Sequence, residues 1–159
     1  MPQENRLELA LFEAVAEACR GMVPESLGQL RLRPRPYGLK AWFGGAEPTK
    51  DHYEAQVVPA HLVPEADVLA LEVGFHLEHR AVEENDEALE RLMSVERRWR
   101  PALGPDVVAG PFLGRPDQWR RVSETWPDPD LGDPDLALDL AVRLTEYITV
   151  LEPLRSAKV

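Results

Sequence analysis

The chain has 159 residues, of which 44% are hydrophobic and 29% are charged, and this composition excludes an intrinsically disordered protein. We expect one globular domain spanning residues 1–159. The formal net charge of −10 disfavours non-specific binding to nucleic acid, which depends mainly on neutralising phosphates. No apolar run reaches the roughly 20 residues that span a bilayer, and the N-terminus lacks a signal-peptide pattern, so we predict a cytoplasmic protein without membrane contact.

Residues 3–20 have the apolar spacing of an amphipathic helix, with Leu7, Leu11 and Val15 on the apolar stripe. We expect this helix to end at Gly21. Cys19 lies on the same apolar side, which predicts a small buried side chain rather than a nucleophile.

Residues 30–43 change to the alternation of a β-strand, but Pro34 and Pro36 interrupt it. Prolines are confined to edge strands and breaks, so this segment is either one edge strand or a strand broken in two. It begins the most basic part of the chain, since residues 31–50 contain five basic residues and one acidic residue.

Two further strands are expected at 52–58 and at 68–79. The second has the clearest pattern in the chain, because Leu69, Leu71 and Val73 begin a row of apolar residues that alternates with small or polar ones. Such alternation predicts one buried face and one polar face.

The C-terminal half has a helical pattern over 83–99, ended by Pro101 and Gly104, and two short candidate strands at 107–113 and 119–122. A last helix is expected to begin with Asp133 as its N-cap. Helix capping and a rigid turn explain the aspartates at 128–135 better than a calcium loop, because their spacing is not that of an EF-hand.

These elements follow the order α-β-β-β-α-β-β-α. The order predicts an α+β fold with a mixed or antiparallel sheet of about five strands and with helices packed on one face.

If strands 52–58 and 68–79 pair, their polar face brings together Glu54, Glu72 and His76, which are the candidates for catalysis and for binding a divalent metal ion. Glu72 and His76 are about 13 Å apart along one strand, so both can bind one metal only with help from the neighbouring strand. A solvated polar face is the simplest alternative. Five other residues of this surface are candidates for ligand binding: His52, Gln56, Glu78, Lys40 and Trp42.

Gly74 interrupts the polar row of the best strand, where glycine often marks a close approach by another group. It either opens room between Glu72 and His76 or accommodates a large neighbouring side chain such as Trp42.

The first helix, the three strands and the next helix resemble the layout of the restriction-endonuclease-like, or PD-(D/E)XK, group. The chain is also similar to small bacterial domains of that layout, in which a helix ending near a Leu-Gly pair, here Leu103-Gly104, precedes a hairpin. The resemblance implies a magnesium-dependent nuclease site with Asp51 or Glu54 as the first acid and Glu72 as the second. Gly74 stands at the lysine position of that motif, which implies an inactive relative used for binding.

No specific catalytic or nucleotide-binding motif is present in the sequence. We therefore predict a domain that acts by protein or ligand contacts, with self-association through the polar face or through the edge near 33–37 favoured over nucleic acid as a partner. The alternative is a metal-dependent hydrolase or degenerate nuclease that uses Glu54, Glu72 and His76. The sequence leaves open whether the protein is an enzyme.

Overall fold

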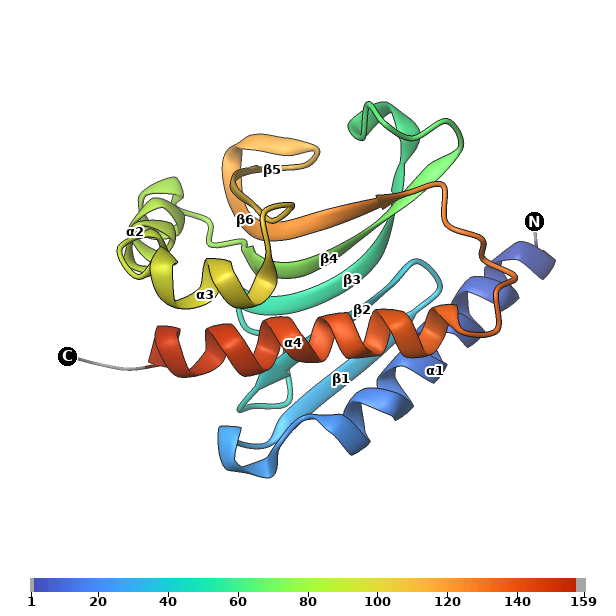
Figure 1. Cartoon of the computed structure of the whole chain (residues 1–159), viewed down its shortest axis with the longest axis horizontal. Coiled ribbons are helices and arrows are strands. Elements are labelled where there is room, and N and C mark those ends of the chain that lie inside the picture. Colours follow the sequence, from blue (N-terminus) through green and yellow to red (C-terminus); the bar gives the residue numbers. More distant parts are fainter. Residues whose placement is uncertain (1, 157–159) are drawn as a thin grey trace.

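A computed structural model describes the backbone of residues 2–156 and the side chains of residues 8–155. This part of the chain forms an α+β fold with a six-stranded antiparallel sheet and four α-helices (Figure 1). The elements in chain order are α1 (Pro2–Met22), β1 (Leu30–Arg35), β2 (Gly38–Phe43), β3 (Asp51–Pro59), β4 (Leu69–Leu77), α2 (Val82–Met93), α3 (Glu96–Leu103), β5 (Val108–Phe112), β6 (Arg115–Pro127) and α4 (Leu136–Ser156).

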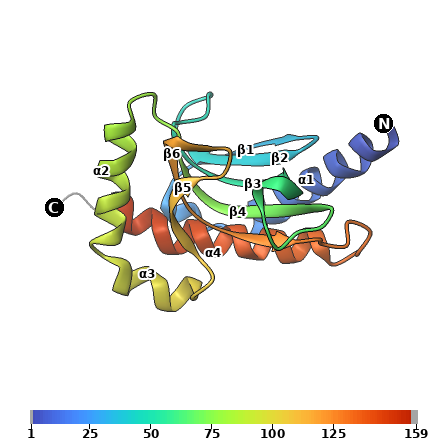
Figure 2. The same cartoon turned by 90° about the horizontal axis from the view of Figure 1, so that it is seen from above.

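The strands lie in the order β1-β2-β3-β4-β6-β5, and every neighbouring pair is antiparallel. Helices α1 and α4 cover one face of the sheet, whereas α2 and α3 lie together at one end of the molecule (Figures 1 and 2). No helix among the described residues is long and apolar enough to cross a membrane.

The sixth strand comes from the proline-containing segment, because residues 30–43 form a hairpin of two strands rather than one. Pro34 of β1 lies opposite Leu39 of β2. Because β1 is an edge strand, the missing N–H of Pro34 disrupts no hydrogen bond between central strands. The predicted count of about five strands was therefore too low by one.

The core lies between the sheet and the two long helices, as the apolar patterns predict. Its fully buried side chains include Phe12 and Val15 of α1, Tyr53 of β3 and Leu144 of α4. Cys19 is buried in the same layer, and burial raises the pKa of its thiol to about 11. Leu7 lies outside the residues whose side chains the structure describes.

Two boundaries differ from the prediction. The single helix expected over 83–99 is two helices separated at Ser94 and Val95, and the indole N–H of Trp99 donates across this break to the Leu92 carbonyl. The last helix begins at Leu136, because Asp133 caps a preceding turn by accepting a hydrogen bond from the N–H of Asp135.

Strand β6 is far longer than the predicted 119–122. Its polar residues hide the strand pattern because two of them are buried or half-buried through specific partners. Ser123 donates to Glu72, and Glu124 accepts from Tyr147.

Candidate metal centre

The pairing of β3 with β4 places the predicted polar residues on the sheet face away from α1 and α4. His52 lies opposite His76, Glu54 opposite Gly74, and Gln56 opposite Glu72. This row lies in the middle of the sheet, between its two central strands.

This face is closed to solvent at its centre. Glu72 and His76 are both 0% exposed, so the interpretation of a solvated polar face is wrong here. The ring of Phe112 lies 4.7 Å from the His76 ring, centroid to centroid, and Trp119 packs in turn against Phe112 at 5.3 Å. Aromatic side chains of β5 and β6 thus cover the polar row, and buried polar groups need partners.

Four side-chain atoms form a compact group at this point, and we call them the metal-site cluster: His52 Nε2, His76 Nδ1, Glu54 Oε1 and Glu78 Oε2. His52 Nε2 lies 2.9 Å from Glu54 Oε1 and 3.3 Å from Glu78 Oε2. His76 Nδ1 lies 3.2 Å from each of the same two oxygens. Each of these two nitrogens thus contacts both carboxylate oxygens of the cluster. Ligand atoms from the four residues lie within 4.8 Å of one another.

The outer nitrogen of each imidazole has a partner that can only accept a hydrogen bond. His52 Nδ1 lies 2.8 Å from the carbonyl oxygen of Thr49, and His76 Nε2 lies 2.9 Å from Glu72 Oε2. Each outer nitrogen must therefore carry a proton and donate it. In the neutral ring the inner nitrogen is then a lone pair that faces two carboxylate oxygens, which is repulsive.

Positive charge inside the cluster removes this repulsion, and it can be supplied by two further protons or by one divalent cation. In the metal-free protein the pKa values of both histidines shift in the direction that favours these two protons. Burial alone would lower the pKa of His76, but the negative charge of Glu72 and hydrogen bonds to Glu54, Glu72 and Glu78 raise that pKa well above its ordinary value. Burial alone would also lower the pKa of His52, but hydrogen bonds to Glu54 and Glu78 raise it above its ordinary value.

The pKa values of the two carboxyl groups shift in the direction that favours their ionised form. Burial would raise the pKa of Glu54, but its contacts with His52 and His76 lower that pKa to about 2. The pKa of Glu78 is lowered as well, by hydrogen bonds to the two histidines that outweigh its burial.

Glu72 was predicted as a ligand or catalytic residue, but the structure places it behind His76 and outside the metal-site cluster. Its carboxylate accepts hydrogen bonds from Gln56 at 2.7 Å, from Ser123 at 2.6 Å and from His76. The predicted Cα separation of about 13 Å between Glu72 and His76 does not keep their side chains apart, because both reach along the strand until His76 Nε2 and Glu72 Oε2 are 2.9 Å apart. Glu72 and Gln56 therefore support and orient His76.

Gly74 permits the close approach of β6. A Cβ atom on Gly74 would lie 2.4 Å from the Val122 carbonyl oxygen and 2.6 Å from the Ser123 Cβ, and the glycine φ is +154°. The space above Gly74 is thus filled by Ser123, and the prediction that Trp42 lies over it is wrong. Trp42 instead donates its indole N–H to the Gly45 carbonyl.

The four nitrogen–oxygen distances of the metal-site cluster are close to those between ligands of one four-coordinate transition-metal ion, and its ligand atoms lie within 4.8 Å of one another. Four ligands at about 2.0–2.1 Å from a tetrahedral zinc ion are about 3.3–3.4 Å from one another. The observed nitrogen–oxygen distances of 2.9 to 3.3 Å require an expansion of only a few tenths of an ångström. The outer hydrogen bonds of His52 and His76 are those that hold metal-binding histidines in other proteins.

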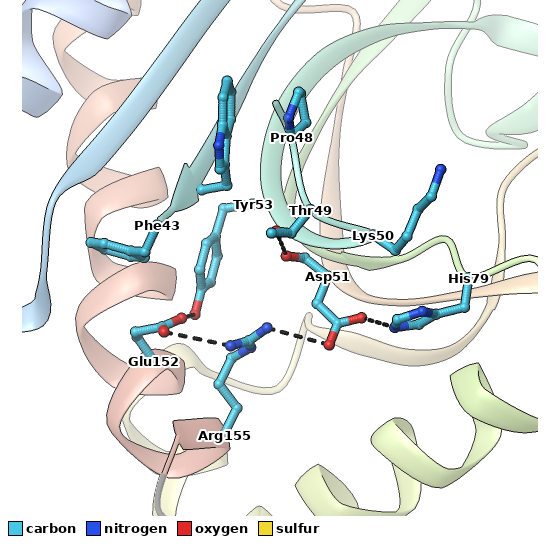
Figure 3. A pocket seen from close by; sticks show the side chains of 10 residues that line it. Phe43, Pro48, Thr49, Lys50, Asp51, Tyr53, His79, Glu152 and Arg155 are labelled. Atoms are coloured by element: carbon cyan, nitrogen blue, oxygen red, sulfur yellow. Dashed lines mark hydrogen bonds and ion pairs between the residues drawn. The ribbon is translucent and has the colours of Figure 1, made fainter. Parts of the chain in front are cut away.

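Asp51, the other acidic residue singled out by the family resemblance, lies apart from this cluster. It pairs with His79 and Arg155 at the wall of a separate cavity of about 380 Å³, where Arg155 also contacts Glu152 (Figure 3). Tyr53 donates to Glu152 in the same network. Glu54 rather than Asp51 therefore lies on the same buried polar face as Glu72.

Sequence reasoning missed the carbonyl of Thr49 and the hydroxyl of Ser123. A backbone carbonyl leaves no signal in residue type, and Ser123 lies one residue beyond the strand expected at 119–122. Arg121, also missed, is 8% exposed and donates to the Ser123 hydroxyl at 2.9 Å, beside the Glu72 carboxylate.

Comparisons with known proteins found no family model, no curated protein and no solved structure that matches this chain. The restriction-endonuclease-like resemblance accordingly stays a prediction.

Proposed function

We propose that this protein binds one divalent transition-metal ion, with zinc as the best match, at the metal-site cluster. Imidazole nitrogens and carboxylate oxygens are established zinc ligands, and imidazole also suits copper, iron and nickel. Magnesium and calcium prefer oxygen ligands in larger numbers, so two nitrogen donors disfavour them.

The observation that carries the proposal is the orientation of the two imidazoles. Thr49 and Glu72 hold the outer N–H groups of His52 and His76, so both inner nitrogens face the same two carboxylate oxygens. This orientation is costly for an uncharged pair of rings and favourable for a metal ion.

The proposed ion joins the two central strands, since His52 and Glu54 belong to β3 whereas His76 is on β4 and Glu78 follows it. Four protein ligands fill the positions of a tetrahedral zinc ion, which is typical of a site that stabilises or organises rather than one that holds a reactive water. A binding function is thus favoured over the alternative of a metal-dependent hydrolase.

The test is metal content after equilibrium dialysis against zinc, combined with ¹⁵N chemical shifts of the histidine rings. The wild-type protein should retain one equivalent. The ¹⁵N signals of His52 Nε2 and His76 Nδ1 should shift on metal addition, while His52 Nδ1 and His76 Nε2 remain protonated.

The matched variants are Glu54→Gln/Glu78→Gln, which removes both anionic ligands, and Glu83→Gln/Glu87→Gln, which removes the same charge from exposed positions on α2. The first pair should lose the zinc and the second should keep it. Equal zinc content in both folded variants, or no zinc in the wild type, would show that the proposal is wrong.

A further inference from the structure

A basic groove lies beside the metal-site cluster. Its volume is about 370 Å³, and His52 and Glu78 form part of its wall. The cationic side chains that line it are Arg33, Arg35, Lys40 and Lys50. Their concentration contrasts with the net charge of −10 on the whole chain.

The strand register places these cations next to the cluster. Arg33 lies opposite Lys40, and Lys40 lies opposite Glu54, so the polar face runs from basic residues at the sheet edge to the metal-site cluster at its centre. Directly opposed residues are about 4.5–5.5 Å apart. The groove and the cluster are therefore adjacent parts of one surface.

Most of these cations form no ion pair with the acidic side chains that the structure describes. Among the described side chains, no ion pair involves Arg35, Lys40 or Lys50, and Arg33 has only a loose contact of 3.5 Å with Glu47. Glu47 and Glu78 also line the groove, but its four cations outnumber them, and this excess of positive charge favours an anionic ligand.

We propose that this groove binds a phosphate monoester with its phosphate between the groove cations and the exposed side of the metal. The part of this proposal that involves the metal rests on the proposed function. A phosphate monoester carries a charge of about −1.5 to −2 at neutral pH, whereas a simple carboxylate carries −1, and arginine guanidinium groups match phosphate oxygens in pairs. The volume suits a small molecule rather than a polymer.

Two features support the arrangement at the metal. Glu78 is the most exposed of the cluster residues, with 12% of its side chain accessible, and it lines the groove directly. A phosphate held by the groove cations would therefore lie on the Glu78 side of the proposed metal.

The test is calorimetric titration of the zinc-loaded protein with phenyl phosphate, which has one phosphate on a small apolar group. Benzoate is the probe for a single carboxylate. Phenyl phosphate should bind, and benzoate should bind at least about tenfold more weakly. Lys40→Met and Arg35→Gln should each weaken phenyl phosphate binding about tenfold, because each removes one charge-assisted contact.

Arg97→Gln is the matched control, because Arg97 is exposed on α3 and no ion pair among the described side chains holds it. It should bind phenyl phosphate like the wild type. Absence of binding to the zinc-loaded wild type, or equal binding by all three variants, would overturn the groove proposal while leaving the metal site intact.

If dialysis shows no zinc uptake, the proposed function fails separately, and the metal-free protein is titrated instead. Binding that still depends on Lys40 and Arg35 would then support the phosphate groove alone. Absence of binding in that titration would overturn it.

Discussion

Glu72→Gln separates a residue that supports a metal ligand from a ligand itself. Glu72 accepts a hydrogen bond from the Nε2–H group of His76 but does not belong to the metal-site cluster, so the variant keeps all four proposed ligands. It removes one negative charge behind the ring and lowers the basicity of His76. Zinc binding should therefore weaken and should not be abolished.

The expected size follows from the environment of the Glu72 carboxylate. Loss of a partner that orients a metal-bound histidine typically lowers affinity about 10–100-fold, which corresponds to about 1.4–2.7 kcal/mol. The glutamine amide group must also face one of the donors Gln56 and Ser123, because both donate to the carboxylate. A buried polar group left without a partner costs about 1–3 kcal/mol of folding stability.

The assay is competition for zinc against a chromophoric chelator at fixed pH, with thermal unfolding of the metal-free protein as a second measurement. Glu87→Gln, an exposed carboxylate on α2, is the control and should change neither value. An unchanged zinc affinity in Glu72→Gln would refute the supporting role. Complete loss of zinc from the folded variant would instead make Glu72 a ligand.

Two further outcomes follow from the same geometry. The raised pKa of His76 stabilises the metal-free protein at pH values below the unfolded pKa of about 6.5, and this stabilisation is lost as pH rises through the folded pKa. Zinc competes with the same protons for the histidines. The rise in melting temperature that zinc causes should therefore grow with pH. Melting curves at pH 6 and pH 8 test this, and a zinc effect that shrinks with pH contradicts it. Gly74→Ala should lower the free energy of unfolding by at least about 2 kcal/mol in chemical denaturation, because the new Cβ meets the β6 backbone at a positive φ. Gly45→Ala is the control and should have little effect, because a Cβ there meets nothing within 4 Å. Equal stability of the two variants would refute the close approach of β6 to Gly74.

Strong periodicity was enough to predict the elements that build the core. The alternation in β4 and the stripes of α1 and α4 are set by burial on one side, and each forms within a few residues of its predicted range. The boundaries that failed depend on tertiary partners. Ser123 is buried because Glu72 accepts its hydroxyl, and no local pattern in β6 contains that information.

The candidate site was predictable in part for the same reason. Pairing of 52–58 with 68–79 was enough to bring Glu54, His76 and His52 together, because the register of two strands fixes which side chains share a face. Sequence reasoning could not assign the separate roles of Glu72 and Glu78. That distinction depends on the contacts of the Glu72 side chain with His76 and with Ser123 of β6.

The charges of the site connect the proposed metal binding to the stability of the fold. Glu54, Glu72 and Glu78 bring three negative charges to a largely buried region in which Arg121 supplies one positive charge, so two further positive charges are needed there. Two histidine protons or one divalent ion meet this need equally in charge, and either links β3 to β4, the protons through His76–Glu54 and His52–Glu78. A ligand that binds the folded state alone adds about 2.7 kcal/mol of stability at a hundred times its dissociation constant. The stability of this protein should therefore depend on free zinc concentration, a dependence that the metal-free fold cannot produce.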